Sequence, residues 1–259
     1  PELVSKLLND EMTKKANIVI IGEKQVFEKG NNIADYFSGI LLLNNNQYDE
    51  SYKFLKQLDG LEESHINFSS KYLFSLVNLG KFNEAFSYAK KLEKRNLGNF
   101  ESDLIIGIYY LHNNELDLAQ KYFLKLKNRK SKFMLNSFVS SSLYTWVSFK
   151  DLELDSAKDQ IDKTDSKFEN LKKIQNTFLH CFYDSEKTSF FFENLTSKNA
   201  TDFSRYNYFY TKYLSNKNKI EEAKKVLESS LKLYPRNLLL NQHQIELSEG
   251  KLQYNFDCR

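Results

Sequence analysis

Apolar residues between Asn31 and Lys127 recur at the spacing of an α-helix. One stretch places them at intervals of three or four residues, at Phe82, Ala85, Phe86, Ala89 and Leu92. Residues at this spacing share one face of a helix. The pattern therefore predicts amphipathic helices that each bury one apolar stripe.

The helical pattern repeats every 34 residues. Its clearest marker is a small residue, which occurs at Ser51, Ala85 and Ala119. Large apolar residues keep the same step three residues before and seven residues after each marker, at Tyr48, Phe82, Leu116, Leu58, Leu92 and Leu126. Gly39 and Gly107 stand 12 residues ahead of the first and third markers. This period predicts helix pairs that stack on their copies, because one pair cannot bury its apolar face alone.

Asparagine and glycine mark the corners between the two helices of a pair. Asn46, Gly80 and Asn114 occupy equivalent places in three successive units, and Asn218 holds that place in a later unit. Both residue types tolerate the left-handed conformation that ends many helices. The corners therefore support the repeat independently of the apolar pattern.

These features resemble the tetratricopeptide repeat (TPR) family, whose 34-residue unit packs two antiparallel helices. The resemblance rests on small residues in the first helix, on alanine in the second helix with Ser51 as a variant, and on a closing proline: Gly39, Gly107, Ala85, Ala119, Ala157, Ala223 and Pro235. It covers about 31–127 and 204–237. Leu73 replaces the first-helix glycine in the middle unit, and Asp35, Ser69 and Asp103 stand where the family has tryptophan. The resemblance implies an all-α, right-handed solenoid of about six helix pairs.

We expect four segments along the chain. Residues 1–30 form an irregular helical cap, and residues 31–127 form three TPR-like repeats. Residues 128–203 form two degenerate pairs, one within Ser140–Lys163 and one within Phe168–Leu195 with its corner near Asp184. Residues 204–259 form one repeat and a partial one, whose first helix spans Asn237–Gly250.

Composition adds few constraints. The net charge of +3 creates no general field for nucleic acid or anionic membranes. The two cysteines, Cys181 and Cys258, are far apart and indicate no disulfide framework, which leaves the compartment open, with the cytoplasm slightly favoured. No apolar run is long enough to span a bilayer. The chain opens at Pro1 without an initiator Met and stops just after a partial repeat, so we expect a fragment of a longer protein. Its richness in Asn, Lys, Tyr, Phe and Ile favours an AT-rich genome and therefore a bacterial source.

No catalytic, metal or cofactor motif is present in the sequence. The four histidines, His65, His112, His180 and His243, are scattered over different units, without the ligand spacing of a metal site. The neighbours His180 and Cys181 would point about 100° apart on a helix, so we interpret them as structural and not as a base and nucleophile. We expect neither a cofactor nor enzymatic activity in this chain.

Two basic runs follow second helices. They contain Lys90, Lys91, Lys94 and Arg95, and then Lys125, Lys127, Arg129, Lys130 and Lys132. We interpret both as solvated helix ends and loops, because cations favour helix C-termini. Nucleic-acid binding is disfavoured, and RNA binding would show as retention that weakens with salt.

The TPR resemblance implies that first helices line a concave groove. The corresponding positions are mostly apolar: Tyr36, Ile40, Leu43, Phe74, Val77, Leu104, Ile108 and Leu111. The C-terminal unit instead carries Arg205, Tyr208, Lys212 and Asn216. Leaving large apolar groups in water forgoes about 1.5–3 kcal/mol each. We therefore expect either self-burial, for example by the chain's own ends, or an apolar or amphipathic partner peptide in the groove.

The resemblance implies a protein-interaction scaffold without catalysis of its own, with Tyr36, Ile40, Phe74, Ile108 and Tyr208 as anchors. An alternative is the accessory array of a larger enzyme or cell-envelope assembly factor, whose working domain lies outside this chain. The sequence identifies no partner.

Overall fold

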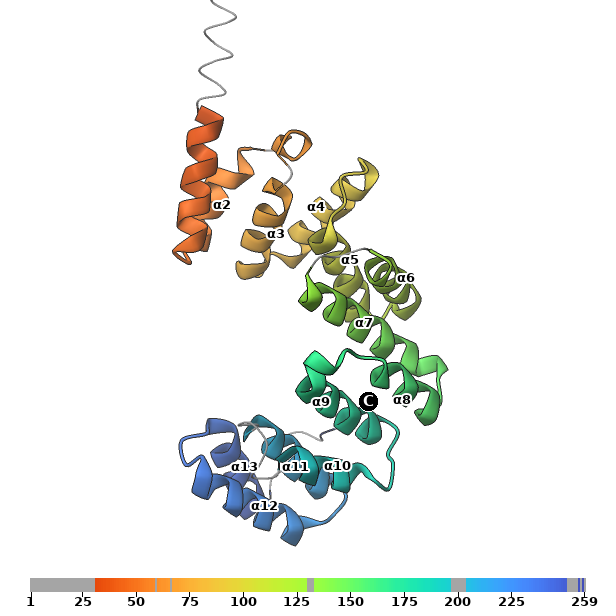
Figure 1. Cartoon of the computed structure of the whole chain (residues 1–259). Helices are drawn as coiled ribbons and strands as arrows, with labels where there is room; N and C mark the ends of the chain where they lie inside the picture. The colour runs from red at the N-terminus through yellow and green to blue at the C-terminus, as the bar shows by residue number, and fades with distance from the viewer. Residues whose placement is uncertain are drawn as a thin grey trace, which may run out of the picture. The chain divides into compact units, whose positions relative to one another are not determined.

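The computed structural model describes residues 31–58, 60–65, 67–129, 133–196, 204–250, 256 and 258. Every regular element within these residues is helical (Figure 1). The chain divides into two compact units, Pro1–Arg129 (unit 1) and Lys130–Arg259 (unit 2). The expected cap at 1–30 lies outside the described residues.

The described residues of unit 1 form three helix pairs in chain order. The first pairs the helix at 31–44 with α2, and the second and third pair α3 with α4 and α5 with α6. A short 3-10 helix, η1, lies between α2 and α3. The bounds are α2 Tyr48–Lys56, η1 Leu61–Glu63, α3 Phe68–Asn78, α4 Phe82–Lys94, α5 Phe100–His112 and α6 Leu116–Lys127.

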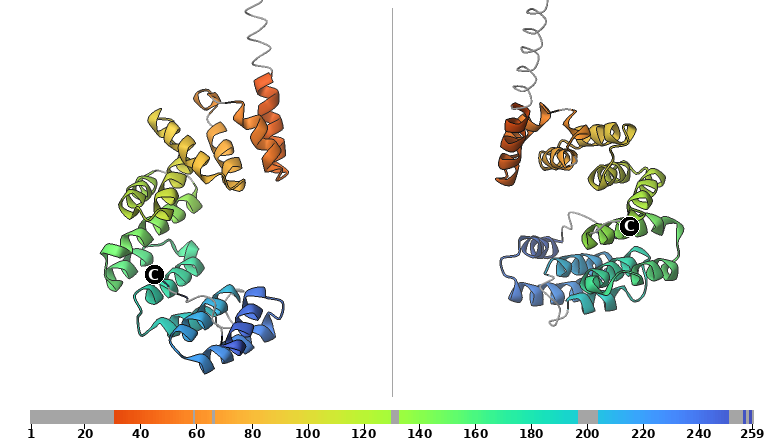
Figure 2. Two further views of the ribbon diagram at one scale, coloured as in Figure 1. Left: turned by 180° about the vertical axis from the view of Figure 1, so that it is seen from behind. Right: turned by 45° about the horizontal axis from the view of Figure 1, so that its top comes forward.

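The described residues of unit 2 form three further pairs and a final single helix. These helices are coloured green to blue in Figure 2. Its pairs are α7 with α8, α9 with α10, and α11 with α12, and α13 packs on both α11 and α12. The bounds are α7 Met134–Ser148, η2 Phe149–Asp151, α8 Leu154–Asp162, η3 Ser166–Phe168, α9 Glu169–Phe182, α10 Thr188–Thr196, α11 Ser204–Asn216, α12 Ile220–Leu233 and α13 Leu238–Glu249. The helix α7 begins at Met134, before the expected start at Ser140.

The predicted corners are confirmed. Asn46, Gly80, Asn114 and Asn218 all have positive φ, between 58° and 69°, and Asp184 has φ 50°. At each corner the amide after this residue donates to a carbonyl five residues earlier, for example Lys81 N–H to the Leu76 carbonyl. A hydrogen bond from an amide to the carbonyl five residues earlier, next to a residue with positive φ, is typical of the Schellman motif. This motif satisfies the last carbonyls of the first helix.

The repeating small residues lie at the helix crossings. Ser51, Ala85, Ala119, Ala157 and Ala223 are all fully buried, as the stacking of helix pairs requires. The hydroxyl of Ser51 donates to the Gly39 carbonyl at 2.8 Å, so its burial leaves no unpaired polar atom. The serine therefore substitutes for alanine without a desolvation penalty.

Size complementarity explains the irregular glycine pattern of the first helices. A Cβ on Gly39 would lie 2.6 Å from Leu55, and one on Gly107 would lie 2.5 Å from Phe123. In each case the opposing residue is 16 positions later and is buried. The middle pair reverses the sizes, because Leu73 shares one core cluster with Ala89, which is also 16 positions later. A large residue on either helix is thus matched by a small one on its partner.

Candidate partner-binding surface

Two rows of apolar residues cross the first helices of unit 1. Their members are 34 residues apart on the helix at 31–44, on α3 and on α5, with Ile40, Phe74 and Ile108 in one row and Leu43, Val77 and Leu111 in the other. Phe74 is 52% exposed and Ile108 is 45% exposed, and Val77 and Leu111 are also exposed. Because α3 packs directly against α5, these four exposed residues lie on adjacent helices, and we name them the apolar patch.

The other groove residues expected in unit 1 offer less open surface. Leu43 is only 3% exposed, so it belongs to the core and does not line a groove, contrary to expectation. Ile40 and Leu104 are half-buried. Tyr36 is half-buried against the ring of His65, with 4.6 Å between ring centroids, and burial raises the pKa of its hydroxyl. The apolar patch on α3 and α5 is therefore the most open part of the predicted surface.

The equivalent positions on α11 of unit 2 are buried or half-buried. Lys212 of α11 corresponds to Ile108 by the same offset that relates Ala223 to Ala119, yet Lys212 is only 2% exposed. Tyr208 is half-buried, with its ring 5.9 Å from that of His243. Asn216 is exposed, and the side chain of Arg205 lies outside the described residues.

A buried polar cluster joins α11 to α13. The ammonium of Lys212 forms an ion pair with Glu246, which is 5% exposed and lies 34 residues later, and Nδ1 of His243 lies 3.2 Å from the same carboxylate. Burial alone would raise the pKa of Glu246, but hydrogen bonds from Lys212 and His243 outweigh it and hold the pKa below its usual range. Burial lowers the pKa of His243. Because Lys212 is already neutralised inside the protein, it offers no free cation to a ligand.

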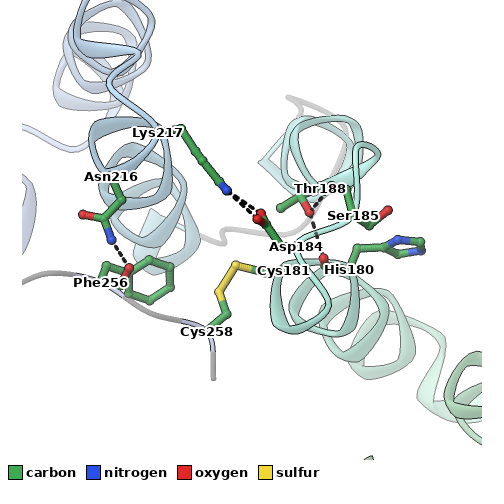
Figure 3. Close-up of a disulfide and its surroundings, with 9 residues drawn as sticks. All are labelled: His180, Cys181, Asp184, Ser185, Thr188, Asn216, Lys217, Phe256 and Cys258. Carbon is green, nitrogen blue, oxygen red and sulfur yellow. Dashed lines mark hydrogen bonds and ion pairs between the residues drawn. A yellow bond between two sulfur atoms is a disulfide. The ribbon is translucent and has the colours of Figure 1, made fainter. Parts of the chain in front are cut away.

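Cys181 and Cys258 form a disulfide, which the sequence did not indicate. Their Cα atoms are 5.6 Å apart although 77 residues separate them in sequence. Phe256 contacts α11 and Cys258 meets α9, a tertiary arrangement that cysteine spacing cannot reveal. The side chains of His180 and Cys181 point in different directions (Figure 3), and His180 stacks on Phe191 with centroids 4.0 Å apart.

No protein-family model matches the sequence, and no curated protein matches it. Among solved structures, the chain is similar to one titled "Crystal structure of APC/C hetero-tetramer Cut9-Hcn1", with a TM-score of 0.55 and 13% identity over 91% of this chain and 45% of that one. The chain thus spans less than half the length of that protein. This similarity agrees with the helix pairs and corners seen in the structure. The chain has a TPR-like fold.

Two further solved structures are less similar to this TPR-like chain. One is titled "Crystal structure of YrrB: a TPR protein with an unusual peptide-binding site", with a TM-score of 0.43 and 14% identity over 86% of this chain and 97% of that one. The other is "Structure of Naa15/Naa10 bound to HypK-THB", with a TM-score of 0.32 and 16% identity over 84% and 39%.

The basic runs of the TPR-like array contact buried carboxylates. Asp103 is fully buried, and its two oxygens accept hydrogen bonds of 2.8 Å from Lys125 Nζ and Arg129 Nε. The buried carboxylate of Glu62, in η1, accepts from Arg95 Nη1 at 2.7 Å. The first contact lies within the α5–α6 pair, and the second joins η1 to the end of α4. Arg95, Lys125 and Arg129 thus remain partly exposed, as helix ends are expected to be, and also pair with buried carboxylates.

No group of three His, Cys, Asp or Glu side chains suited to a metal ion occurs among the described residues of the TPR-like array. In the same part of the chain, none of the helices combines the length and the apolar character needed to cross a bilayer.

Sequence reasoning missed two features of unit 1. Ile33, Phe37 and Leu41 are strongly exposed at four-residue spacing, a second apolar stripe on the helix at 31–44 that its period could have revealed. A surface pocket of about 490 Å³ also lies among residues of α2, α3 and α4, and no sequence motif indicates it. The pocket is lined by Leu55, Lys56, Phe68, Tyr72, Asn83, Glu84, Ser87, Tyr88 and Lys91.

Proposed function

We propose that this TPR-like chain is a protein-interaction scaffold whose apolar patch binds an apolar or amphipathic segment of a partner protein. The observation that carries the proposal is the exposure of Phe74, Val77, Ile108 and Leu111 on two adjacent first helices. Apolar groups gathered on a soluble protein's surface commonly mark an interaction site. The proposal assigns no catalytic role to this chain.

Burial of the apolar patch would supply useful binding energy. A large apolar side chain gains about 1.5–3 kcal/mol on full burial, so Phe74 and Ile108, each about half exposed, can each gain about 1 kcal/mol or more. Phe74 contacts Tyr48 of α2, with 6.3 Å between ring centroids, which limits the freedom of the ring before binding. A pre-positioned aromatic ring loses less entropy when a partner docks.

The shape of the apolar patch favours a helical ligand. Its members lie three residues apart along each helix, Phe74 with Val77 and Ile108 with Leu111, so the patch is one turn long and two helices wide. An amphipathic helix presents apolar side chains at the same three- and four-residue spacing. The solved Cut9-Hcn1 structure is described as a hetero-tetramer; it supports the proposal in that a similar fold forms part of an assembly.

A photo-cross-linking amino acid at position 74 of the full protein, in its native host, tests the proposal. The matched control carries the same group at Phe82, which is also exposed but lies on the second helix α4. We expect one partner to be cross-linked from position 74 and not from position 82. The purified partner should then bind Phe74→Ser and Ile108→Ser at least about tenfold more weakly, and Phe82→Ser with unchanged affinity. Unchanged binding by folded Phe74→Ser and Ile108→Ser variants would refute the patch assignment.

A further inference from the structure

Side chains at equivalent repeat positions are exposed in unit 1 and buried in unit 2. Phe74 and Ile108 are 52% and 45% exposed, whereas Lys212 and Glu246, at the equivalent positions of α11 and α13, are 2% and 5% exposed. Repeat geometry alone would give these positions similar exposure. In unit 2 the side chains of Lys212 and Glu246 instead form a buried ion pair that joins α11 to α13.

The same helix, α11, also contacts the end of the chain. After α13 the described residues Phe256 and Cys258 lie against the first helices of the two preceding pairs (Figure 3). The Phe256 ring packs on Phe209 of α11 with 5.5 Å between centroids, and the Phe256 carbonyl accepts a hydrogen bond from the Asn216 side chain. Cys258 is joined to Cys181 of α9. Phe256 and Cys258 are named the C-terminal strap.

The C-terminal strap completes an aromatic cluster. Phe178 of α9 packs edge-to-face on Phe209 at 5.5 Å and on Tyr206 at 5.9 Å, and Phe256 adds a further ring to this group. Beside it, Lys217 Nζ lies 2.7 Å from Asp184 Oδ2, which ties the end of α11 to the corner after α9. The strap thus contributes an apolar anchor, a backbone acceptor and a covalent bond to one surface.

We propose that the C-terminal strap is a built-in ligand of unit 2 and that the Cys181–Cys258 disulfide controls its occupancy. A dithiol reductant would open it in two steps. One thiolate attacks a protein sulfur, which breaks the protein disulfide and forms a mixed disulfide, and the second thiolate then displaces the remaining protein sulfur. The reductant loses two electrons and becomes a disulfide, and its two protons end on Cys181 and Cys258.

Opening the disulfide turns a tethered contact into an exchangeable one. The covalent bond holds Phe256 beside Phe209 at a high effective concentration, and without it only noncovalent contacts, among them the Phe209 ring and the hydrogen bond from Asn216, hold this anchor. A freed aromatic face on α9 and α11 would accept a similar segment, namely an extended peptide with one aromatic anchor. The state of the strap then follows the redox conditions, because disulfides persist in oxidising compartments and are reduced in the cytosol.

Alkylation and hydrogen exchange on the full chain test the proposal. Protein purified without reductant should resist alkylation of both cysteines by iodoacetamide. Reduction with dithiothreitol should accelerate amide exchange in the peptide containing Phe256 by at least about tenfold. Cys258→Ser should show the fast exchange without reductant, whereas Phe82→Ser, far from the disulfide in sequence and in unit 1, should respond to reductant like the wild type. Freely alkylated cysteines in unreduced protein, or exchange that ignores reduction, would overturn the proposal.

A peptide supplied in trans tests the docking surface separately. A synthetic peptide of residues 251–259, activated as a thionitrobenzoate disulfide at its cysteine, is reacted with the Phe256→Ala, Cys258→Ser protein. If the aromatic face guides the strap, this peptide should modify Cys181 at least about tenfold faster than the same peptide with alanine in place of its phenylalanine. Equal rates would show that the face does not recognise the aromatic ring.

Discussion

The matched sizes at the first-helix crossings predict a specific rescue. Phe123→Ala removes a fully buried ring and should cost about 3–5 kcal/mol of unfolding free energy. Gly107→Leu overpacks the same crossing, because even a Cβ would lie 2.5 Å from Phe123, and should cost about 1–3 kcal/mol after its gain in helix propensity. If the two changes were independent, the double variant would lose about 4–8 kcal/mol. It instead recreates the Leu73–Ala89 arrangement of the neighbouring pair, so we expect a loss of only about 1–3 kcal/mol.

Urea unfolding followed by far-ultraviolet circular dichroism measures these free energies. The matched control combines Phe123→Ala with Gly39→Leu, because Gly39 opposes Leu55 and has no steric conflict with Phe123. The control pair should be additive, whereas Gly107→Leu with Phe123→Ala should show a favourable coupling of about 2 kcal/mol or more. Additivity in both pairs would refute the idea that each crossing tolerates either order of sizes.

Three further predictions follow from named contacts. Asp103→Asn should lower the unfolding free energy by about 1–3 kcal/mol in urea titrations, since it weakens a buried acceptor of two cations that are themselves partly exposed; an equal stability would mean that the cations are merely solvated. Asn114→Gly should raise the thermal midpoint slightly and Asn114→Ala should lower it, each by about 1 kcal/mol or less in free energy, because the corner has positive φ; the reverse order would contradict a left-handed corner. Burial lowers the pKa of both His180 and His243, so the unfolded chain binds more protons below the ordinary value of 6.5, and stability should fall as the pH drops from about 7.5 to about 5.5. Unfolding midpoints across that range, compared with a His180→Gln, His243→Gln variant, check the sign, and a midpoint independent of pH would exclude the effect.

The helix pairs could be predicted from the sequence because their signals are local. Asn46 and Gly80 adopt the left-handed geometry for reasons contained in their own side chains, and Ala85 fits its crossing by size alone. Even Asp184, in a degenerate unit, keeps the corner geometry with φ 50°. The solenoid class needed only the period and these residues.

The open and closed surfaces could not be predicted in the same way. Ile108 and Lys212 hold equivalent repeat positions, yet their exposures are 45% and 2%. The difference depends on tertiary neighbours: Lys212 pairs with Glu246 of α13. The disulfide also cannot be predicted from cysteine spacing, because Cys181 and Cys258 are 77 residues apart and meet only through tertiary contacts.

Departures from the repeat pattern compensate one another in space. Asp103 stands where the TPR family has tryptophan, and Lys125 and Arg129 belong to a basic run that from sequence is interpreted as a solvated helix end and loop. In the structure these two anomalies are one feature, since the cations neutralise the buried carboxylate across adjacent helices. A sequence comparison that scores each position separately treats Asp103 and its cations as two unrelated departures, and each lowers the score. A chain whose helices stack normally can therefore have a divergent sequence. A search for repeats of this kind should therefore test pairs of positions 16 or about 22–26 residues apart, where a departure at one site predicts the matching departure at the other.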